Sequence, residues 1–145
     1  MIDLNWNKDF AIEREGVVLM DNGNHKLYKC PADHWTIGHG HNLEAHGLPP
    51  RMATELLNMQ LASVKKECTE KVKGWDKLNA ARMSVLIDMN FNMGWTTLKK
   101  FKKFLAAVES GDYELAAKEM KDSNWYRQVG IRAETLHKMM QSGTY

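Results

Sequence analysis

The chain has 145 residues, of which 43% are hydrophobic and 26% are charged, and its formal net charge is +2. This length and composition predict one compact domain, residues 1–145, and exclude a disordered chain. No apolar run is long enough for a transmembrane helix, and the segment MIDLNWNKDFAIEREG lacks the apolar core of a signal peptide. We therefore expect a cytoplasmic protein whose two cysteines, Cys30 and Cys68, stay free thiols.

Charge is distributed unevenly along the chain. Residues 1–72 contain 8 Lys+Arg and 10 Asp+Glu, a net charge of −2, whereas residues 73–145 contain 12 and 8, a net charge of +4. The segment LKKFKKF predicts a basic face that could attract an anionic envelope surface, through Lys99, Lys100, Lys102 and Lys103. The alternative is an ordinary solvated helix face whose opposite side buries Phe101, Phe104, Leu105 and Val108.

A helix is predicted over residues 3–14. Trp6 and Phe10 lie four residues apart there, which is the spacing of an amphipathic helix. Trp75 and Trp125 also lie on apolar helical faces. All three tryptophans are therefore expected in the core.

Three short strands are predicted after this helix. The turn-forming residues 21–24 lie between the β-prone segments 17–19 and 26–28, so a hairpin is expected. A second turn is expected at residues 30–33, followed by a strand at residues 35–37 that leads into two glycines.

Helices are predicted for the rest of the chain. The prolines at 49–50 suit the start of a long helix, and apolar residues continue at helical spacing to residue 72. Further helices, separated by glycines and a Ser-Asn pair, are expected over residues 78–93, about 97–109, 112–122 and 131–142.

These elements predict an α+β fold. A small antiparallel β-sheet lobe, at about residues 15–48, is expected near the N-terminus, and the long helix joins it to a larger helical lobe. Enzymes that cleave polymers commonly hold an extended substrate in the cleft of such a fold.

The segment YKCPADHWTIGHGH, residues 28–41, follows the pair Glu15-Gly16 and brings a thiol and a hydroxyl, Cys30 and Thr36, into a turn-rich region. An acid, a thiol and a hydroxyl suit acid-assisted hydrolysis and suggest a glycosidase. In the second half the landmarks NFNMG, WYRQ, Arg132-Ala133 and GTY follow in order. Together these segments resemble the phage-type lysozymes, the endolysins of glycoside hydrolase family 24, over nearly the whole chain and imply a lysozyme-like fold.

The resemblance implies hydrolysis of the β-1,4 bond between N-acetylmuramic acid and N-acetylglucosamine in bacterial peptidoglycan. It implies a monomer without metal or cofactor that binds glycan strands, not nucleic acid, and waits in the host cytoplasm until a separate protein permeabilises the membrane. Glu15 matches the general acid. The residues that match positions of substrate binding or acid tuning are His41, Phe91, Asn92, Gln128 and Arg132. Among these, Arg132 matches an arginine that reaches the acid from the helical lobe.

Cys30 stands where many members of that family carry aspartate. A thiolate is a competent base and a strong nucleophile, so we expect Cys30 to assist the attacking water while Thr36 orients that water by a hydrogen bond. A covalent thioglycoside route is the mechanistic alternative. In a purely structural interpretation, Cys30 is a small buried apolar residue.

The spacing before Cys30 departs from the family pattern. Glu15 and Cys30 are fifteen positions apart, whereas the family usually has about nine, and the excess falls on residues 20–25. A longer hairpin accounts for this, because lengthening two paired strands together leaves the residues at their base in place. The other candidates for the acid are Glu13, Asp21 and Asp33.

Two other classes of protein stay open. The histidines His34, His39, His41 and His46 suggest a zinc-dependent cell-wall amidase or peptidase, although no HExxH helix is present. The lysine-rich segment and five tryptophans suggest a noncatalytic module that binds cell wall or nucleic acid.

Gln60 is a further departure from the family pattern. It stands where related enzymes hold an aspartate that pairs with the histidine matching His41, so no such ion pair is expected here.

Overall fold

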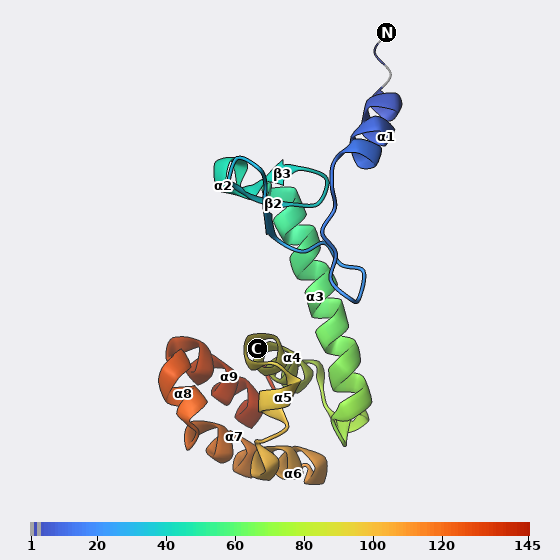
Figure 1. The fold of residues 1–145 in the computed structure, drawn as a ribbon. Coiled ribbons are helices and arrows are strands. Elements are labelled where there is room, and N and C mark those ends of the chain that lie inside the picture. Colours follow the sequence, from blue (N-terminus) through green and yellow to red (C-terminus); the bar gives the residue numbers. More distant parts are fainter. Residues whose placement is uncertain (1, 3) are drawn as a thin grey trace. The chain divides into compact units, whose positions relative to one another are not determined.

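The structure, a computed structural model, describes residue 2 and residues 4–145 (Figure 1). The chain divides into two compact units, Met1–Glu55 (unit 1) and Leu56–Tyr145 (unit 2). In unit 1 the elements are α1 (Leu4–Arg14), β1 (Tyr28–Lys29), β2 (Trp35–Ile37), β3 (His41–Asn42), α2 (Leu43–His46) and the first part of α3 (Pro50–Lys71). The small sheet near the N-terminus and the helices after it confirm the predicted α+β fold class.

The sheet of unit 1 is antiparallel with the strand order β1-β2-β3. Tyr28 pairs with Thr36, and Thr36 pairs with Asn42 on its other side. Residues paired in this way present their side chains on the same face of a sheet. Thr36, on the central strand, is the buried member of this row, with 3% exposure.

A hairpin precedes the sheet at the position of the extra residues. Leu19 and His25 form an isolated antiparallel bridge, and Met20 N donates a 2.8 Å hydrogen bond to the carbonyl of Asn24. Gly23, at φ +83°, allows the tight turn between the two arms. The predicted hairpin is therefore confirmed, although its arms form a single bridge and not the two predicted strands.

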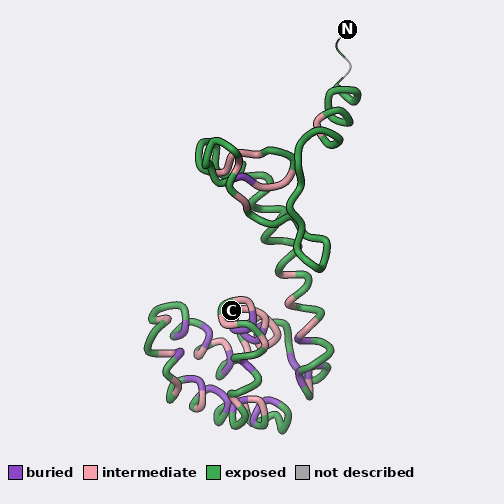
Figure 2. Tube along the Cα trace, in the orientation of Figure 1, coloured by how far each residue is buried: buried purple, intermediate pink, exposed green. Residues whose placement is uncertain are grey.

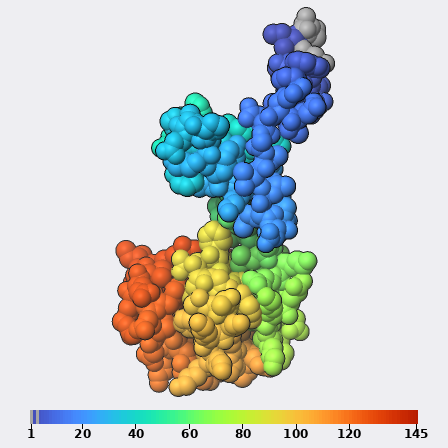
Figure 3. All heavy atoms as spheres, in the orientation of Figure 1, coloured from blue at the N-terminus to red at the C-terminus, as the bar shows by residue number. Residues whose placement is uncertain are grey.

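The helices of unit 2 enclose the main hydrophobic core. They are the rest of α3, η1 (Trp75–Lys77), α4 (Ala80–Met93), α5 (Trp95–Leu98), α6 (Lys102–Ser110), α7 (Tyr113–Lys121), α8 (Asn124–Val129) and α9 (Ile131–Ser142). Figure 2 shows buried segments concentrated among these helices, and in Figure 3 the atoms of residues 80–145 form one continuous body. The large, fully buried side chains include Leu86, Met89, Phe104, Met120 and Met140.

Several helix starts are specified by local side chains. Asn79, Asp112 and Ser123 precede α4, α7 and α8, and each accepts a hydrogen bond from a backbone N–H in the first turn of its helix. Such caps satisfy N–H groups that have no partner within the helix. The predicted helices over 78–93, 112–122 and 131–142 are confirmed, and so is the long helix, α3.

The helix predicted at about residues 97–109 is confirmed from Lys102 onward as α6, but residues 99–101 interrupt it after α5. Leu98 and Phe104 are both almost fully buried in one core. On a continuous helix, residues six positions apart would point about 120° away from each other. The interruption lets both side chains enter the same core. The predicted buried stripe is confirmed in α6, where Phe104 and Val108 are each 1% exposed.

Some elements and the environment of one tryptophan differ from the prediction. β3, α2, η1 and α8 were not predicted, and the strands actually formed begin at Tyr28 instead of residue 17. Trp75 and Trp125 are buried as predicted, but Trp6 is 62% exposed and stacks on Phe10 at 5.1 Å. In the described part of the chain, α1 buries none of its residues. No helix in the described residues has the length and apolar character of a membrane span.

Candidate active site

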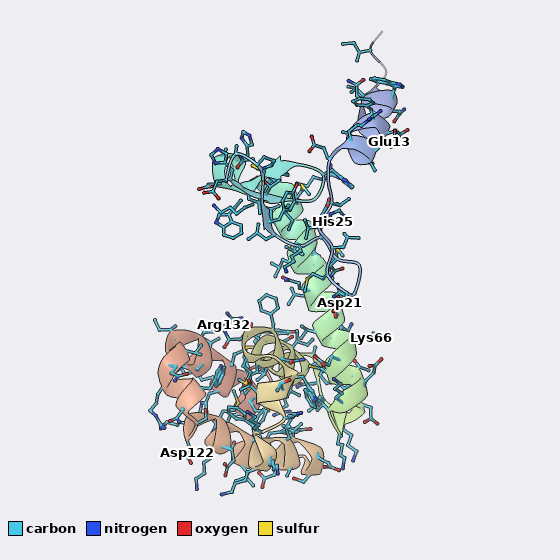
Figure 4. All side chains as sticks on the ribbon, in the orientation of Figure 1. Glu13, Asp21, His25, Lys66, Asp122 and Arg132 are labelled. Carbon is cyan, nitrogen blue, oxygen red and sulfur yellow. The ribbon has the colours of Figure 1, made fainter. Side chains whose placement is uncertain are left out.

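A cavity of about 520 Å³ lies within unit 1 and collects the three residues predicted to do the chemistry. Its walls are Glu15, Gly16, Tyr28, Cys30, Pro31, Ala32, His34, Thr36, Gly40 and Asn42. Among the described residues, Glu15 is the only carboxylate of this wall. Glu13 projects from α1 and Asp21 lies in the hairpin, where Figure 4 labels both. These two residues and Asp33 were the alternative candidates for the acid, and none of the three lines the cavity.

Glu15 directly follows α1, and its side chain lies against the turn between β2 and β3. Its backbone N–H donates a 2.8 Å hydrogen bond to the carbonyl of Ala11, which continues the last turn of the helix. A Cβ atom on Gly40 would lie 3.0 Å from both Cδ and Oε2 of Glu15. The carboxyl group therefore rests against a backbone position that has no side chain.

Cys30 begins the turn that joins β1 to β2. Its backbone N–H donates to the carbonyl of His34 at 3.1 Å, and its carbonyl accepts from the N–H of Asp33 at 2.8 Å. Asp33 adopts a positive φ of 62°, a conformation that aspartate tolerates better than most residues. The turn predicted at residues 30–33 is confirmed, and it holds a half-buried thiol at the cavity wall.

The pKa of the Cys30 thiol is lowered from its ordinary value. The largest cause is hydrogen bonding with the backbone of His34, and smaller contributions in the same direction come from the backbone of Ala32 and the hydroxyl of Thr36. Partial desolvation opposes this shift, because it disfavours the charged thiolate. The site therefore favours the nucleophilic and basic form of the residue.

Thr36 is fixed by the centre of the sheet. Its Oγ1 donates a 3.0 Å hydrogen bond to the carbonyl of His34. A hydroxyl carries a single hydrogen, so donation to His34 and donation to the Cys30 sulfur are alternatives. In either arrangement the oxygen lone pairs of this hydroxyl can accept a hydrogen bond from a water in the cavity.

The histidines of unit 1 contact residues that are near them in the sequence or in the fold. His41 Nε2 is 2.7 Å from the carbonyl of Gly47, and His34 Nδ1 is 3.5 Å from Glu44 Oε2. The rings of His25 and His39 meet edge to face. Over the residues that the structure describes, no three His, Cys, Asp or Glu side chains gather in a group that could hold a metal ion. The zinc-dependent alternative therefore has no ligand set there.

The remaining predicted site residues belong to unit 2. Arg132 of α9, labelled in Figure 4, forms a two-point ion pair with Asp88 of α4, at 2.7 Å and 2.8 Å. This hydrogen bonding raises the pKa of Arg132, with partial desolvation acting against it. Asn92 Oδ1 accepts a 3.0 Å hydrogen bond from Trp125 Nε1. Gln128 is exposed on α8.

Phe91 and Gln60 line a different cavity of about 320 Å³, which lies between α3 and α4. Asn90 also lines it, with its Nδ2 donating 3.1 Å to Glu67. The side chain of Asn90 is 2% exposed, and its Oδ1 has no hydrogen-bond partner among the described residues.

Sequence reasoning did not include Tyr28, Gly40 and Asn42 among the site residues, although all three line the cavity. The Tyr28 hydroxyl donates a 3.4 Å hydrogen bond to the carbonyl of Gly16 and so ties β1 to the segment that carries the acid. Tyr28 and Asn42 flank Thr36 across the sheet, so the strand register was the signal needed to find them.

The α+β fold is that of a lysozyme-like protein. The sequence pattern of the Phage lysozyme family matches residues 20–141. The chain belongs to that family. The matched range contains every predicted site residue except Glu15, which lies five positions before it; the assignment of Glu15 therefore depends on its place in the cavity.

Similar proteins come from a virus and a eukaryote. The pre-baseplate central spike protein Gp5 of Enterobacteria phage T4 is 33% identical over 94 residues, which is 63% of this chain and 16% of that protein. Two proteins of Dictyostelium discoideum, named Probable T4-type lysozyme 2 and 1, are each 33% identical over 70 residues, or 48% of this chain and 41% of theirs. The chain spans less than half the length of each of these relatives.

Proposed function

We propose that this chain is an endolysin muramidase that hydrolyses the β-1,4 bond between N-acetylmuramic acid and N-acetylglucosamine of peptidoglycan. One observation carries the proposal: Glu15, Cys30 and Thr36 line a single cavity in a chain of the phage lysozyme family. The names of the two Dictyostelium relatives support the same activity.

Glycoside hydrolysis needs an acid that protonates the leaving oxygen and a second group that supplies or positions the nucleophile. We assign the first role to Glu15. The thiolate of Cys30 takes the second role, accepting a proton from the attacking water as that water adds to the anomeric carbon. Thr36 accepts a hydrogen bond from the same water and fixes its direction.

The lowered pKa of Cys30 supports its role as a base. An ordinary thiol is mostly protonated near neutral pH and cannot accept the proton. In this site the backbone around His34 stabilises the thiolate, so a larger fraction of the residue is in the active form. The carboxylate that stands here in many relatives would be ionised without such help.

Mass analysis of digested peptidoglycan tests the reaction class. The proposal requires new reducing N-acetylmuramic acid ends, and released peptide or anhydro ends would contradict it. Glu15→Gln should lose activity by at least about 100-fold, since general acid catalysis contributes about that much or more. Binding of intact glycan without any cleavage product would favour the noncatalytic wall-binding module.

Paired substitutions test the thiol. Cys30→Ser removes the ionisable group and should abolish most wall-clearing activity, whereas Cys30→Asp restores a base and should keep activity. Full activity in Cys30→Ser would refute the role of Cys30. A mass increase of the protein by one glycosyl unit during turnover would instead indicate the covalent thioglycoside route.

The proposed setting is the host cytoplasm, with access to the wall after a separate protein opens the membrane. We propose a monomer, because one cavity holds all three catalytic residues of a single chain. Measurement of molar mass in solution checks that part of the proposal.

A further inference from the structure

A second cavity, in unit 2, combines positive charge with an aromatic ring. It has a volume of about 310 Å³, and four lysines line it: Lys71, Lys73, Lys99 and Lys102. Trp95 lines it as well, and Glu109 is its only carboxylate among the described residues. The excess of ammonium groups selects for an anionic ligand.

Most of this positive charge is not neutralised by ion pairs among the described residues. Lys71 pairs with Glu67 on α3 and lies over the Trp95 ring at 5.6 Å from its centre. Lys73, Lys99 and Lys102 take part in no ion pair of the described chain. Like charges held around one cavity repel each other, so a bound anion relieves that repulsion.

The same cavity has an apolar side. Val72 is buried, Leu105 and Trp95 are half-buried, and all three line the space together with Ala106. Tryptophan and lysine are the residues that proteins place at a membrane surface, where the ring and the lysine stems meet apolar groups and the ammonium stays in the polar layer. A bare inorganic anion would leave this apolar side unused.

The lysine segment 99–103 does not form one uniform face. Lys100 and Lys103 line another cavity, of about 380 Å³, which also contains the carboxylates of Glu119 and Asp122. Lys99 and Lys102 instead point to the cavity of Lys71, Lys73 and Trp95. Each pair joins one lysine of the break between α5 and α6, Lys99 or Lys100, with one lysine at the start of α6.

From these contacts we infer that the cavity of Lys71, Lys73, Lys99, Lys102 and Trp95 binds the phosphate headgroup of an anionic membrane lipid. The ammonium groups take the phosphate, and Trp95 with Val72 and Leu105 contacts the glycerol and the upper part of the chains. This site is independent of the proposed hydrolysis, because none of its residues lines the Glu15 cavity.

Two double substitutions with equal loss of charge test the site in the full chain. Lys99→Gln with Lys102→Gln removes two cavity lysines, and Lys100→Gln with Lys103→Gln is the matched control. Binding to phosphatidylglycerol vesicles, measured by cosedimentation, should weaken about 10-fold or more in the first variant and about threefold or less in the control. Phosphatidylcholine vesicles should bind neither variant nor the parent protein.

Equal losses in the two variants would show a diffuse charge effect and overturn the inference, and so would an absence of binding to phosphatidylglycerol. Inorganic phosphate and a single-stranded oligonucleotide are the competing probes. Both inorganic phosphate and soluble short-chain phosphatidylglycerol are added at millimolar concentration to compete with the vesicles for the protein. If inorganic phosphate inhibits vesicle binding as strongly as the short-chain lipid does, the apolar side of the cavity has no role. Tighter binding of the oligonucleotide than of lipid would reassign the site to nucleic acid. Unchanged cleavage of soluble glycan by both variants verifies that they are folded.

Discussion

Gly40 lies directly against the carboxyl group of Glu15, so that a Cβ atom at position 40 would stand 3.0 Å from Cδ and 3.0 Å from Oε2. Such a contact is too short unless the carboxyl group moves. Gly40 also has a φ of +82°, which residues other than glycine rarely adopt. The glycine therefore acts as a positioning residue for the proposed acid.

Gly40→Ala should reduce kcat by about 10-fold or more while KM changes little, because the displaced acid no longer meets the leaving oxygen. Gly38→Ala is the matched control, since Gly38 has a similar φ of +64° but open space around its Cβ position. Both variants should lose about 1 kcal/mol of stability from backbone strain. Steady-state kinetics on soluble glycan and thermal unfolding measure the two effects, and equal kinetic losses would show that strain alone explains them.

Alkylation of Cys30 by iodoacetamide should begin at lower pH than alkylation of free cysteine, because the pKa of this thiol is lowered. Only the thiolate reacts, and a lower pKa moves the rise in rate to the acid side. Cys68 is fully buried and its pKa is raised by desolvation, so it should react much more slowly. Mass spectrometry of the labelled protein across pH, with Cys30→Ser to report the background from Cys68, checks this expectation.

Asn92→Ala should destabilise unit 2 by about 1 kcal/mol, since the partly buried Trp125 Nε1–H loses its acceptor. In a Trp125→Phe background that donor is gone, and the same substitution should cost much less. Chemical unfolding of the four proteins of this cycle measures the coupling. Additive effects would mean that the hydrogen bond contributes nothing.

Arg132→Ala should move the limb of the pH–activity profile that belongs to the proposed acid toward higher pH, if Arg132 acts on that acid as the family resemblance implies. A nearby cation favours an ionised carboxylate, so its removal acts in the opposite direction. Asp88→Asn removes the partner of Arg132 but keeps the cation, and should leave that limb where it is or move it slightly to lower pH. Identical pH profiles for Arg132→Ala and the parent protein would rule out the coupling.

The local parts of the fold could be predicted from the sequence. α3, α4, α7 and α9 follow from apolar residues at helical spacing, with caps such as Asn79 and Asp112 at their starts. The hairpin at residues 20–25 and the turn at Cys30 follow from turn-forming residues. These features depend on neighbours within a few positions, which is why one sequence suffices to find them.

The candidate site also has features that could be predicted from the sequence and others that could not. The positions of Glu15, Cys30 and Thr36 and the order of the landmarks that indicated the family could be found from the sequence. The folded structure was needed to show that Glu15 contacts Gly40, that Thr36 lies between Tyr28 and Asn42, and that Arg132 pairs with Asp88. It also separated Lys99 and Lys102 from Lys100 and Lys103. Each of these facts depends on packing or pairing between elements, and local spacing contains no record of which distant surfaces will meet.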